Sequence, residues 1–402
     1  MKRFPKIFLT FFLLFSFVLA QKPYVILISF DGFRWDYPNR GITPAFSEIA
    51  GEGVHALSLQ PAFPSKTFPN HYSIITGMYP EHHGIIANIF PDPVTGEIYK
   101  LSDHNAVQDS RWYIGEAFWQ TAKRNGIITA SYFWPGSEVN LEYRRPDYYK
   151  EYDKGTPYKS RIDSLIEWLK MPANKRPRFN TIYFRETDDI GHGYGPNSPE
   201  INIAIAQMDS LLIYLRNGLR STLVKDSVNL IVVSDHGMTD VSLKKSVNIE
   251  KKINNPEVLI VGNGPVMMIT PPQDDINKVY SLLKKNENHF KVYKKEDVPD
   301  FYHYNESMLI SPVVLIADLG WSLIDNKIEN GSWGDLKGNH GYDNHQIDMH
   351  GIFYACGPLF KQNYVSGTIW NIDIYPLLCK IYGIGAAPGI DGKLERIGFI
   401  LK

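Results

Sequence analysis

Six acidic and imidazole side chains stand where short apolar segments of the sequence give way to polar or glycine-rich ones. They are Asp31, Asp188, His192, Asp235, His236 and His340. Three carboxylates and three imidazoles offer the oxygen and nitrogen ligands that zinc-type divalent ions prefer. A single Asp of this kind is more simply a cap or turn residue, but the set from separate segments is far more specific. It predicts a site for two zinc ions.

Glycines beside these residues bear on how the ligands meet. The glycine-rich segment 187–196 predicts a loop in which Asp188 and His192 converge on one ion. Asp235 and His236 are neighbours, so both reach an ion only where the preceding strand breaks into a loop. We expect Gly237 to supply the backbone freedom for that break.

A hydroxyl nucleophile is the next requirement, and the segment 64–71 offers two candidates, Ser65 and Thr67. Thr67 lies between two prolines, in a segment too constrained to be an ordinary strand. Contact with a metal ion can activate a hydroxyl without a histidine base. Local spacing does not choose between the two hydroxyls. Asn88 offers an amide donor for a phosphoryl oxygen, although an Asn is often a turn residue.

The composition is that of a large globular protein. Of the 402 residues, 44% are hydrophobic and 21% are charged, which excludes disordered, collagen-like and coiled-coil proteins. The 42 basic and 43 acidic side chains nearly cancel, so we expect no specific binding to nucleic-acid duplexes. The sequence has no Walker loop, dinucleotide fingerprint or serine-esterase elbow, which disfavours motors, dehydrogenases and serine esterases.

Residues 1–20 have the pattern of a secretory signal peptide, with three basic residues before an apolar run over 7–19. An uncleaved anchor is the less favoured alternative, because the run is shorter than the roughly 20 residues that a membrane span prefers. We therefore expect a secreted or periplasmic protein with no stable membrane span after cleavage. Cys356 and Cys379 form one disulfide or remain two buried thiols, and a cysteine-based zinc site is excluded.

Strand-like and helix-like segments alternate along the chain. The apolar, strand-like segments are 24–30, 127–134, 181–184, 229–234 and 351–356, and the helical patterns are 45–51, 114–124, 159–169 and 201–218. The alternation predicts an α/β sandwich around a central mixed, mostly parallel sheet. Ligands of such sheets gather beyond the carboxyl ends of the strands, where the acidic and imidazole residues stand. Within a catalytic domain over 21–402, the Lys-rich segment of about 242–325 predicts a small inserted lobe.

Several motifs in order resemble the nucleotide pyrophosphatase/phosphodiesterase family of the alkaline phosphatase superfamily. They are Asp31-Gly32-Phe33-Arg34 and the segments 64–71, 77–85, 133–137, 188–196, 234–238 and 339–341. The resemblance extends over about residues 24–385. It implies an alkaline-phosphatase-like fold and an enzyme that hydrolyses phosphoric diesters with two zinc ions.

The resemblance also implies a role for each candidate residue. One zinc would be held by Asp188, His192 and His340, and the other by Asp31, Asp235, His236 and the Thr67 hydroxyl. Thr67 then ranks above Ser65 as the nucleophile, and Asn88 is the amide donor to the phosphoryl group. The implied reaction passes through a phosphothreonine intermediate and releases a nucleoside 5'-monophosphate.

Small-molecule nucleotide phosphodiesters are the substrates that the resemblance favours. Phe68 and Tyr152 match aromatic residues that stack on the two faces of a nucleobase, an interaction worth roughly 1–3 kcal/mol per base. Lys66 is a further candidate for substrate binding. The alternatives are a choline-phospholipid (glycerophosphodiester) phosphodiesterase, a phosphomonoesterase of the same superfamily, and a nucleotide-binding protein without activity.

Overall fold

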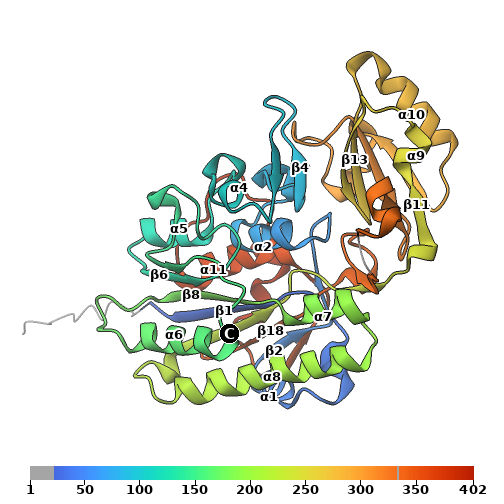
Figure 1. Ribbon diagram of the computed structural model, residues 1–402. Helices are drawn as coiled ribbons and strands as arrows, with labels where there is room; N and C mark the ends of the chain where they lie inside the picture. Colours follow the sequence, from blue (N-terminus) through green and yellow to red (C-terminus); the bar gives the residue numbers. More distant parts are fainter. Residues whose placement is uncertain (1–21, 333–334) are drawn as a thin grey trace, which may run out of the picture.

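The computed structural model describes residues 22–332 and 335–402 (Figure 1). The predicted signal peptide, 1–20, lies outside the described residues. Within the described part of the chain, no helix is both long enough and apolar enough to cross a membrane.

An eight-stranded sheet forms the centre of the molecule, in the order β19-β2-β18-β9-β1-β8-β6-β7. Its strands are β1 (Tyr24–Phe30), β2 (Val54–Ala56), β6 (Thr129–Tyr132), β7 (Tyr148–Lys150), β8 (Phe179–Phe184), β9 (Val228–Val233), β18 (Phe353–Cys356) and β19 (Tyr364–Ser366). Strand β1 pairs in parallel with both β8 and β9, whereas β18 runs antiparallel to β9 and β2. The predicted mixed, mostly parallel sheet is confirmed.

Helices cover both faces of this sheet (Figure 1). One face carries α1 (Pro44–Glu52), α6 (Tyr158–Lys170) and α8 (Pro199–Leu219), and the other carries α2 (Thr67–Thr76), α5 (Phe118–Arg124) and α11 (Ile374–Tyr382). Val25 and Leu27 of β1 pack in the core of the second face, and Ile26 and Ile28 pack in the core of the first. Both faces of β1 are buried, which explains its uninterrupted apolar sequence.

The remaining elements are short. The helices are α3 (Pro80–His83), α4 (His104–Gln108), α7 (Glu186–Tyr194), α9 (Ile249–Ile253) and α10 (Ile276–Lys285). The strands are β3 (Leu59–Gln60), β4 (Ile89–Pro91), β5 (Ile98–Lys100), β10 (Thr239–Asp240), β11 (Ser246–Asn248), β12 (Leu259–Asn263), β13 (Val266–Thr270), β14 (Phe290–Lys294), β15 (Val313–Ala317), β16 (Ser322–Ile324), β17 (Gly338–Asn339) and β20 (Ile369–Trp370).

The predicted loop over 187–196 is wrong, because most of that segment is helix α7. Asp188 and Asp189 stand in its first turn, where carboxylates interact favourably with the positive end of the helix dipole. Gly191 serves close packing, since an added Cβ would lie 3.1 Å from Cε of Met238. Helical spacing of four residues then brings Asp188 and His192 to the same face.

A second sheet stands apart from the main one, in the order β12-β13-β15-β14 (Figure 1). All of its pairs are antiparallel. Its own core includes Met267, Leu315 and Leu283, the last contributed by α10. This sheet falls within the segment of about 242–325, for which an inserted lobe stays a prediction.

The two cysteines are free, buried thiols. Cys356 lies in the core of one face of the main sheet, and Cys379 of α11 lies in the core of the other. Of the two alternatives for these residues, the pair of buried thiols is the one that the structure bears out.

Candidate active site

The candidate metal ligands meet at the carboxyl ends of three adjacent strands. Asp31 follows β1, Asp235 comes two residues after β9, and α7 with Asp188 begins just after β8. His340 comes from a distant segment and directly follows β17, which pairs with β10 beside His236. The rings of His340 and His236 stack with their centroids 3.5 Å apart. The parallel pairing of β1 with β8 and β9, and the antiparallel pairing of β10 with β17, therefore bring these side chains together.

Two groups of side chains can each hold a metal ion, and within each group the ligand atoms lie within 4.8 Å of one another. The groups are Asp31, Asp235 and His236, and Asp188, His236 and His340. In the first group, Nε2 of His236 lies 3.0 Å from Oδ2 of Asp235 and 3.3 Å from Oδ1 of Asp31. In the second, Nε2 of His340 lies 3.5 Å from Oδ1 of Asp188.

His192 lies beside the second group, with its ring centroid 5.1 Å from that of His340. Its Nε2 lies 3.4 Å from Oδ1 of Asp188, but the compact group around Asp188 is completed by His236. His236 lies between the two groups and belongs to both. The six candidate ligands thus form one continuous cluster.

Backbone carbonyls hold all three imidazoles of this cluster in one orientation. Nδ1 of His192, His236 and His340 lies 2.8 Å in each case from a carbonyl oxygen. The acceptors belong to Gly338, Gly237 and Ser65. Since a carbonyl only accepts, each Nδ1 donates a proton and each Nε2 turns its lone pair toward the carboxylates. Metal-binding histidines are typically oriented in this way.

Several carboxylate oxygens in the cluster lack partners. Oδ1 of Asp31, Oδ1 of Asp188 and Oδ2 of Asp235 are buried and accept no hydrogen bond from the described residues. Burial and the charges of Asp235 and Asp188 raise the pKa of Asp31 well above its usual value. Buried, unpaired carboxylates are costly, and a bound cation satisfies them. The donor set therefore fits divalent metal ions.

The two candidate nucleophiles differ in their surroundings. Thr67 is the first residue of α2, and its Oγ1 lies 3.3 Å from Nε2 of His236. The Ser65 hydroxyl is fully buried and donates to the carbonyl oxygen of Tyr342 over 2.7 Å. The hydroxyl that contacts the metal-binding cluster is therefore that of Thr67.

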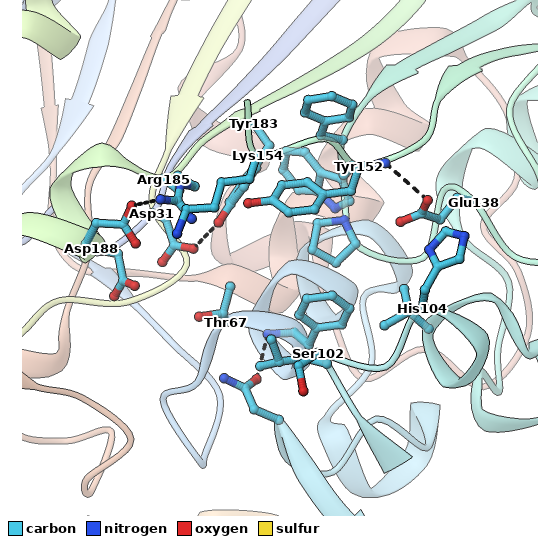
Figure 2. A pocket seen from close by; sticks show the side chains of 18 of the residues that line it. Asp31, Thr67, Ser102, His104, Glu138, Tyr152, Lys154, Tyr183, Arg185 and Asp188 are labelled. Carbon is cyan, nitrogen blue, oxygen red and sulfur yellow. Dashed lines mark hydrogen bonds and ion pairs between the residues drawn. The ribbon is translucent and has the colours of Figure 1, made fainter. Parts of the chain in front are cut away.

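A cavity of about 540 Å³ opens beside the cluster (Figure 2). Its lining includes Thr67, Asn88, Phe68 and Tyr152 together with Asp31, Asp188, His192 and His340. Oδ1 of Asn88 accepts a hydrogen bond from the backbone N–H of Phe68 over 3.1 Å, which fixes the side-chain amide beside Thr67. The cavity is of the size that small-molecule ligands occupy.

Lys66 is placed differently from the other candidates for substrate binding. It is not among the described residues that line the cavity. Its side chain runs along Gly341, where an added Cβ would lie 2.3 Å from Cε of Lys66. Burial lowers the pKa of this ammonium group to about 8, and the charge of Asp188 opposes that shift.

Gly237 does not act as the sequence suggested. Its backbone is not in the positive-φ region that favours glycine. An added Cβ would instead lie 2.1 Å from the carbonyl oxygen of Asp348. Gly237 is therefore required for close approach of the two backbones, and the break after β9 does not depend on its freedom.

The family model for type I phosphodiesterase/nucleotide pyrophosphatase matches residues 25–343. The chain belongs to this family. Human ectonucleotide pyrophosphatase/phosphodiesterase family member 5 is 37% identical over 392 residues, which cover 94% of this chain and 80% of the relative. The Xenopus laevis bis(5'-adenosyl)-triphosphatase is 37% identical over 385 residues, covering 95% of this chain and 82% of the relative.

A solved structure extends the comparison to three dimensions. It is an inactive threonine-to-alanine variant of murine ectonucleotide pyrophosphatase/phosphodiesterase 5 in complex with AMP. The match has a TM-score of 0.90 at 34% identity and covers 95% of this chain and 100% of that chain. The likeness confirms the predicted fold class. As a nucleotide pyrophosphatase/phosphodiesterase, the chain is a phosphoric diester hydrolase.

Sequence reasoning missed two residues that contact the candidate ligands of this phosphodiesterase. The hydroxyl of Tyr183 donates to Oδ2 of Asp31 over 2.5 Å. The buried ring of His71 lies 2.8 Å from Oγ of Ser29, 2.9 Å from the carbonyl oxygen of Thr67 and 3.4 Å from Oδ2 of Asp235. Had helix α2 been predicted, the four-residue spacing would have placed His71 beside the carbonyl oxygen of Thr67. Nothing in the apolar segment 181–184 distinguishes Tyr183.

Proposed function

We propose that this chain cleaves nucleotide phosphodiester and pyrophosphate bonds through a phosphothreonine intermediate on Thr67 and releases nucleoside 5'-monophosphates. The observation that carries the proposal is the contact of Oγ1 of Thr67 with Nε2 of His236, at the wall of a cavity that Phe68 and Tyr152 also line. This arrangement combines a nucleophile, a cluster of metal-binding side chains and an aromatic binding surface within one cavity.

Two zinc ions are the cofactors that the donor set favours. Asp31, Asp235 and His236 would hold the ion beside Thr67, and Asp188, His192 and His340 would hold the other. Mixed oxygen and nitrogen donors with unpaired carboxylate oxygens support this choice. When bound, the ions supply positive charge that offsets the charge of the phosphate and makes a neighbouring hydroxyl more acidic.

The protein side chains perform the displacement in two steps. Oγ1 of Thr67 gives up its proton to solvent and attacks phosphorus, and the leaving oxygen departs with the electron pair of the broken bond. Water then attacks the same phosphorus, the bond to Oγ1 breaks, and Thr67 regains a proton. The amide of Asn88 donates to a phosphoryl oxygen in both steps. Two in-line displacements give net retention of configuration at phosphorus.

Two aromatic side chains support a nucleotide as the substrate. Phe68 and Tyr152 line the same cavity, and 42% of the surface of Tyr152 is exposed and free to stack on a base. Stacking of this kind tolerates different bases. The complex of the murine relative with AMP and the name of the Xenopus relative, a bis(5'-adenosyl)-triphosphatase, support nucleotides in the same way.

The place of action follows from the predicted signal peptide over residues 1–20. We propose that the mature protein is secreted or periplasmic, so it meets nucleotides outside the cytoplasm. Edman sequencing of the secreted product should begin at Gln21, and a product that begins at Met1 would contradict cleavage.

Replacement of the nucleophile tests the proposed reaction. Thr67→Ala should lower the turnover of the p-nitrophenyl ester of thymidine 5'-monophosphate by about 10³-fold or more, because the covalent step is lost. Zinc content, measured by mass spectrometry, should stay near that of the wild type. The matched variant Ser65→Ala should keep most of the activity, since its hydroxyl donates to the carbonyl oxygen of Tyr342 and Ser65 does not line the cavity. Full activity of Thr67→Ala would reject the nucleophile.

A substrate panel separates the nucleotide reaction from its alternatives. The ester of thymidine 5'-monophosphate should be cleaved faster than p-nitrophenyl phosphate, lysophospholipid or glycerophosphocholine. Faster cleavage of p-nitrophenyl phosphate would favour a phosphomonoesterase, and faster cleavage of a choline ester would favour a lipid phosphodiesterase. Binding of nucleotides without any cleavage would favour a protein whose zinc is purely structural.

A further inference from the structure

Two cationic side chains line the active-site cavity without a part in the proposed chemistry. They are Lys154, in the loop between β7 and α6, and Arg185, which directly follows β8. Figure 2 shows both on the side of the cavity that holds Asp31 and Asp188, across from Glu138 and His104. The side of the cavity near the metal-binding cluster therefore carries positive charge that metal binding does not use.

The two cations differ in whether they have a carboxylate partner. Arg185 forms an ion pair with Asp189. Asp189 lines the same cavity as both cations. Within residues 22–332 and 335–402, Lys154 forms neither an ion pair nor a side-chain hydrogen bond. Of the two cations, Lys154 is therefore the one that is not paired with a carboxylate among the described residues.

The loop that carries Lys154 is held by its own hydrogen bonds. Asp153 accepts from the backbone N–H of Gly155 and from the Thr156 hydroxyl, each over 2.8 Å. Lys154 also lines a second cavity, of about 530 Å³, together with Lys159 of α6 and Gln207 of α8. Lys154 therefore stands between two cavities, where a substrate longer than a nucleoside monophosphate can extend.

The position of the cations relative to the proposed substrate indicates what they bind. The base lies between Phe68 and Tyr152, and the scissile phosphorus lies at Thr67. Lys154 is two residues beyond Tyr152, and Arg185 is three residues before Asp188. Both cations line the cavity that Tyr152 and Asp188 also line, so they share it with the base and the metal-binding cluster. Guanidinium and ammonium groups are the usual protein partners of phosphate oxygens.

We propose that Lys154 and Arg185 form an anion subsite, which binds a second phosphate group of the substrate beyond the one that Thr67 attacks. The subsite rests on the proposed function, because it needs the nucleotide in that orientation. The second phosphate has two possible sources with the same chemistry: the polyphosphate chain of the leaving group, or a phosphate on the 3'-oxygen of the same sugar.

Three substrates distinguish these sources on the purified full chain. The reference is the p-nitrophenyl ester of thymidine 5'-monophosphate, with one phosphate. The same ester with an added 3'-phosphate tests the sugar, and ATP tests the polyphosphate chain. Lys154→Met and Arg185→Lys are the variants, and Lys150→Met is the matched control, because Lys150 is an exposed lysine of neighbouring β7 that does not line the cavity.

Lys154→Met should raise KM for a substrate with a second phosphate by about three- to tenfold more than it raises KM for the reference ester. Arg185→Lys should act in the same direction but less, because the charge remains and only the paired donors are lost. The effects should shrink in high salt. Because Lys154 is exposed, its variant should fold as the wild type does.

Each outcome bears on a different claim. A selective rise for ATP assigns the subsite to the polyphosphate chain, and a selective rise for the 3'-phosphorylated ester assigns it to the sugar phosphate. Equal changes in KM for all three substrates, or the same selectivity in Lys150→Met, would overturn the subsite. Failure of the wild type to cleave the reference ester would instead overturn the proposed function.

Discussion

The two ends of the active-site cavity differ in burial and in the segments that supply their side chains. At the metal-binding end, Asp31, Asp235 and His236 are buried and follow directly on strands of the central sheet. At the other end, Tyr152 is exposed and lies in the loop between β7 and α6.

This difference separates chemistry from selectivity. The metal-binding end is held by carbonyl contacts to all three imidazoles, so its geometry is set by the fold and tolerates little change. The loop end contacts the substrate with side chains that can change without disturbing the core. Variants at the metal-binding end should therefore abolish turnover, and variants at the loop end should alter KM.

Removal of metal tests the metal-binding end and should have the largest effect. A chelator should lower turnover of the p-nitrophenyl ester of thymidine 5'-monophosphate by about 10³-fold or more, because the carboxylate cluster loses its neutralising charge. Added zinc should restore it, as followed by release of p-nitrophenol. Turnover that survives exhaustive dialysis against chelator, with no metal detected by mass spectrometry, would refute a metal-dependent reaction.

Tyr183 tests how far the metal-binding end depends on residues that hydrogen-bond to the ligands. Tyr183→Phe removes the donor to Oδ2 of Asp31 and leaves the ring in place. We expect zinc affinity and turnover to fall about 10- to 100-fold together, with KM nearly constant. Tyr132→Phe, which alters a buried tyrosine of β6, is the control. A change in KM alone would show that Tyr183 acts on the substrate rather than on Asp31.

Secondary structure is predicted best from the sequence where all residues of a segment have the same environment. Strand β1 matches the predicted segment residue for residue, because both of its faces are buried and its apolar run is continuous. The six candidate ligands could be named because charged residues after buried strands are conspicuous. Helix α7 was read as a loop because its glycines suggested flexibility, whereas Gly191 is needed for packing against Met238.

The support around the ligands could not be predicted in the same way. Tyr183 and Asp31 are 152 positions apart, and their contact depends on the parallel pairing of β8 with β1. The stacking of His236 on His340 depends in the same way on the pairing of β10 with β17. Such contacts depend on which strands pair and in which register, and the local spacing of residues in the sequence does not give this information.

Tyr152 tests the loop end of the cavity. Tyr152→Ala should raise KM for nucleotide esters about five- to tenfold, the lower part of the range for loss of one stacked base, because the ring is 42% exposed. Turnover at saturation should change little. Steady-state kinetics measure both, with Tyr143→Ala as a control at an exposed tyrosine that does not line the cavity. A loss of turnover as large as that caused by Tyr183→Phe would contradict the separation of the two ends.

His82 lies away from both ends and should affect stability but not catalysis. Its Nδ1 lies 2.8 Å from Oδ2 of Asp391, and this hydrogen bond raises the pKa of His82 to about 9 despite partial burial. Because the folded-state pKa exceeds the unfolded value of about 6.5, the stabilisation is complete below pH 6.5 and is lost as the pH rises through about 9.

His82→Gln should therefore lower the melting temperature at pH 6 by roughly 1–3 °C, since a partly exposed pair contributes little after solvent screening. The difference between variant and wild type should fade by about pH 10, where the wild-type imidazole is neutral. Calorimetry at both pH values measures it, and kinetics on the thymidine ester should match the wild type. A fall in turnover would mean that the segment 79–83 helps to shape the cavity. The catalytic geometry would then depend on residues outside both ends of the cavity.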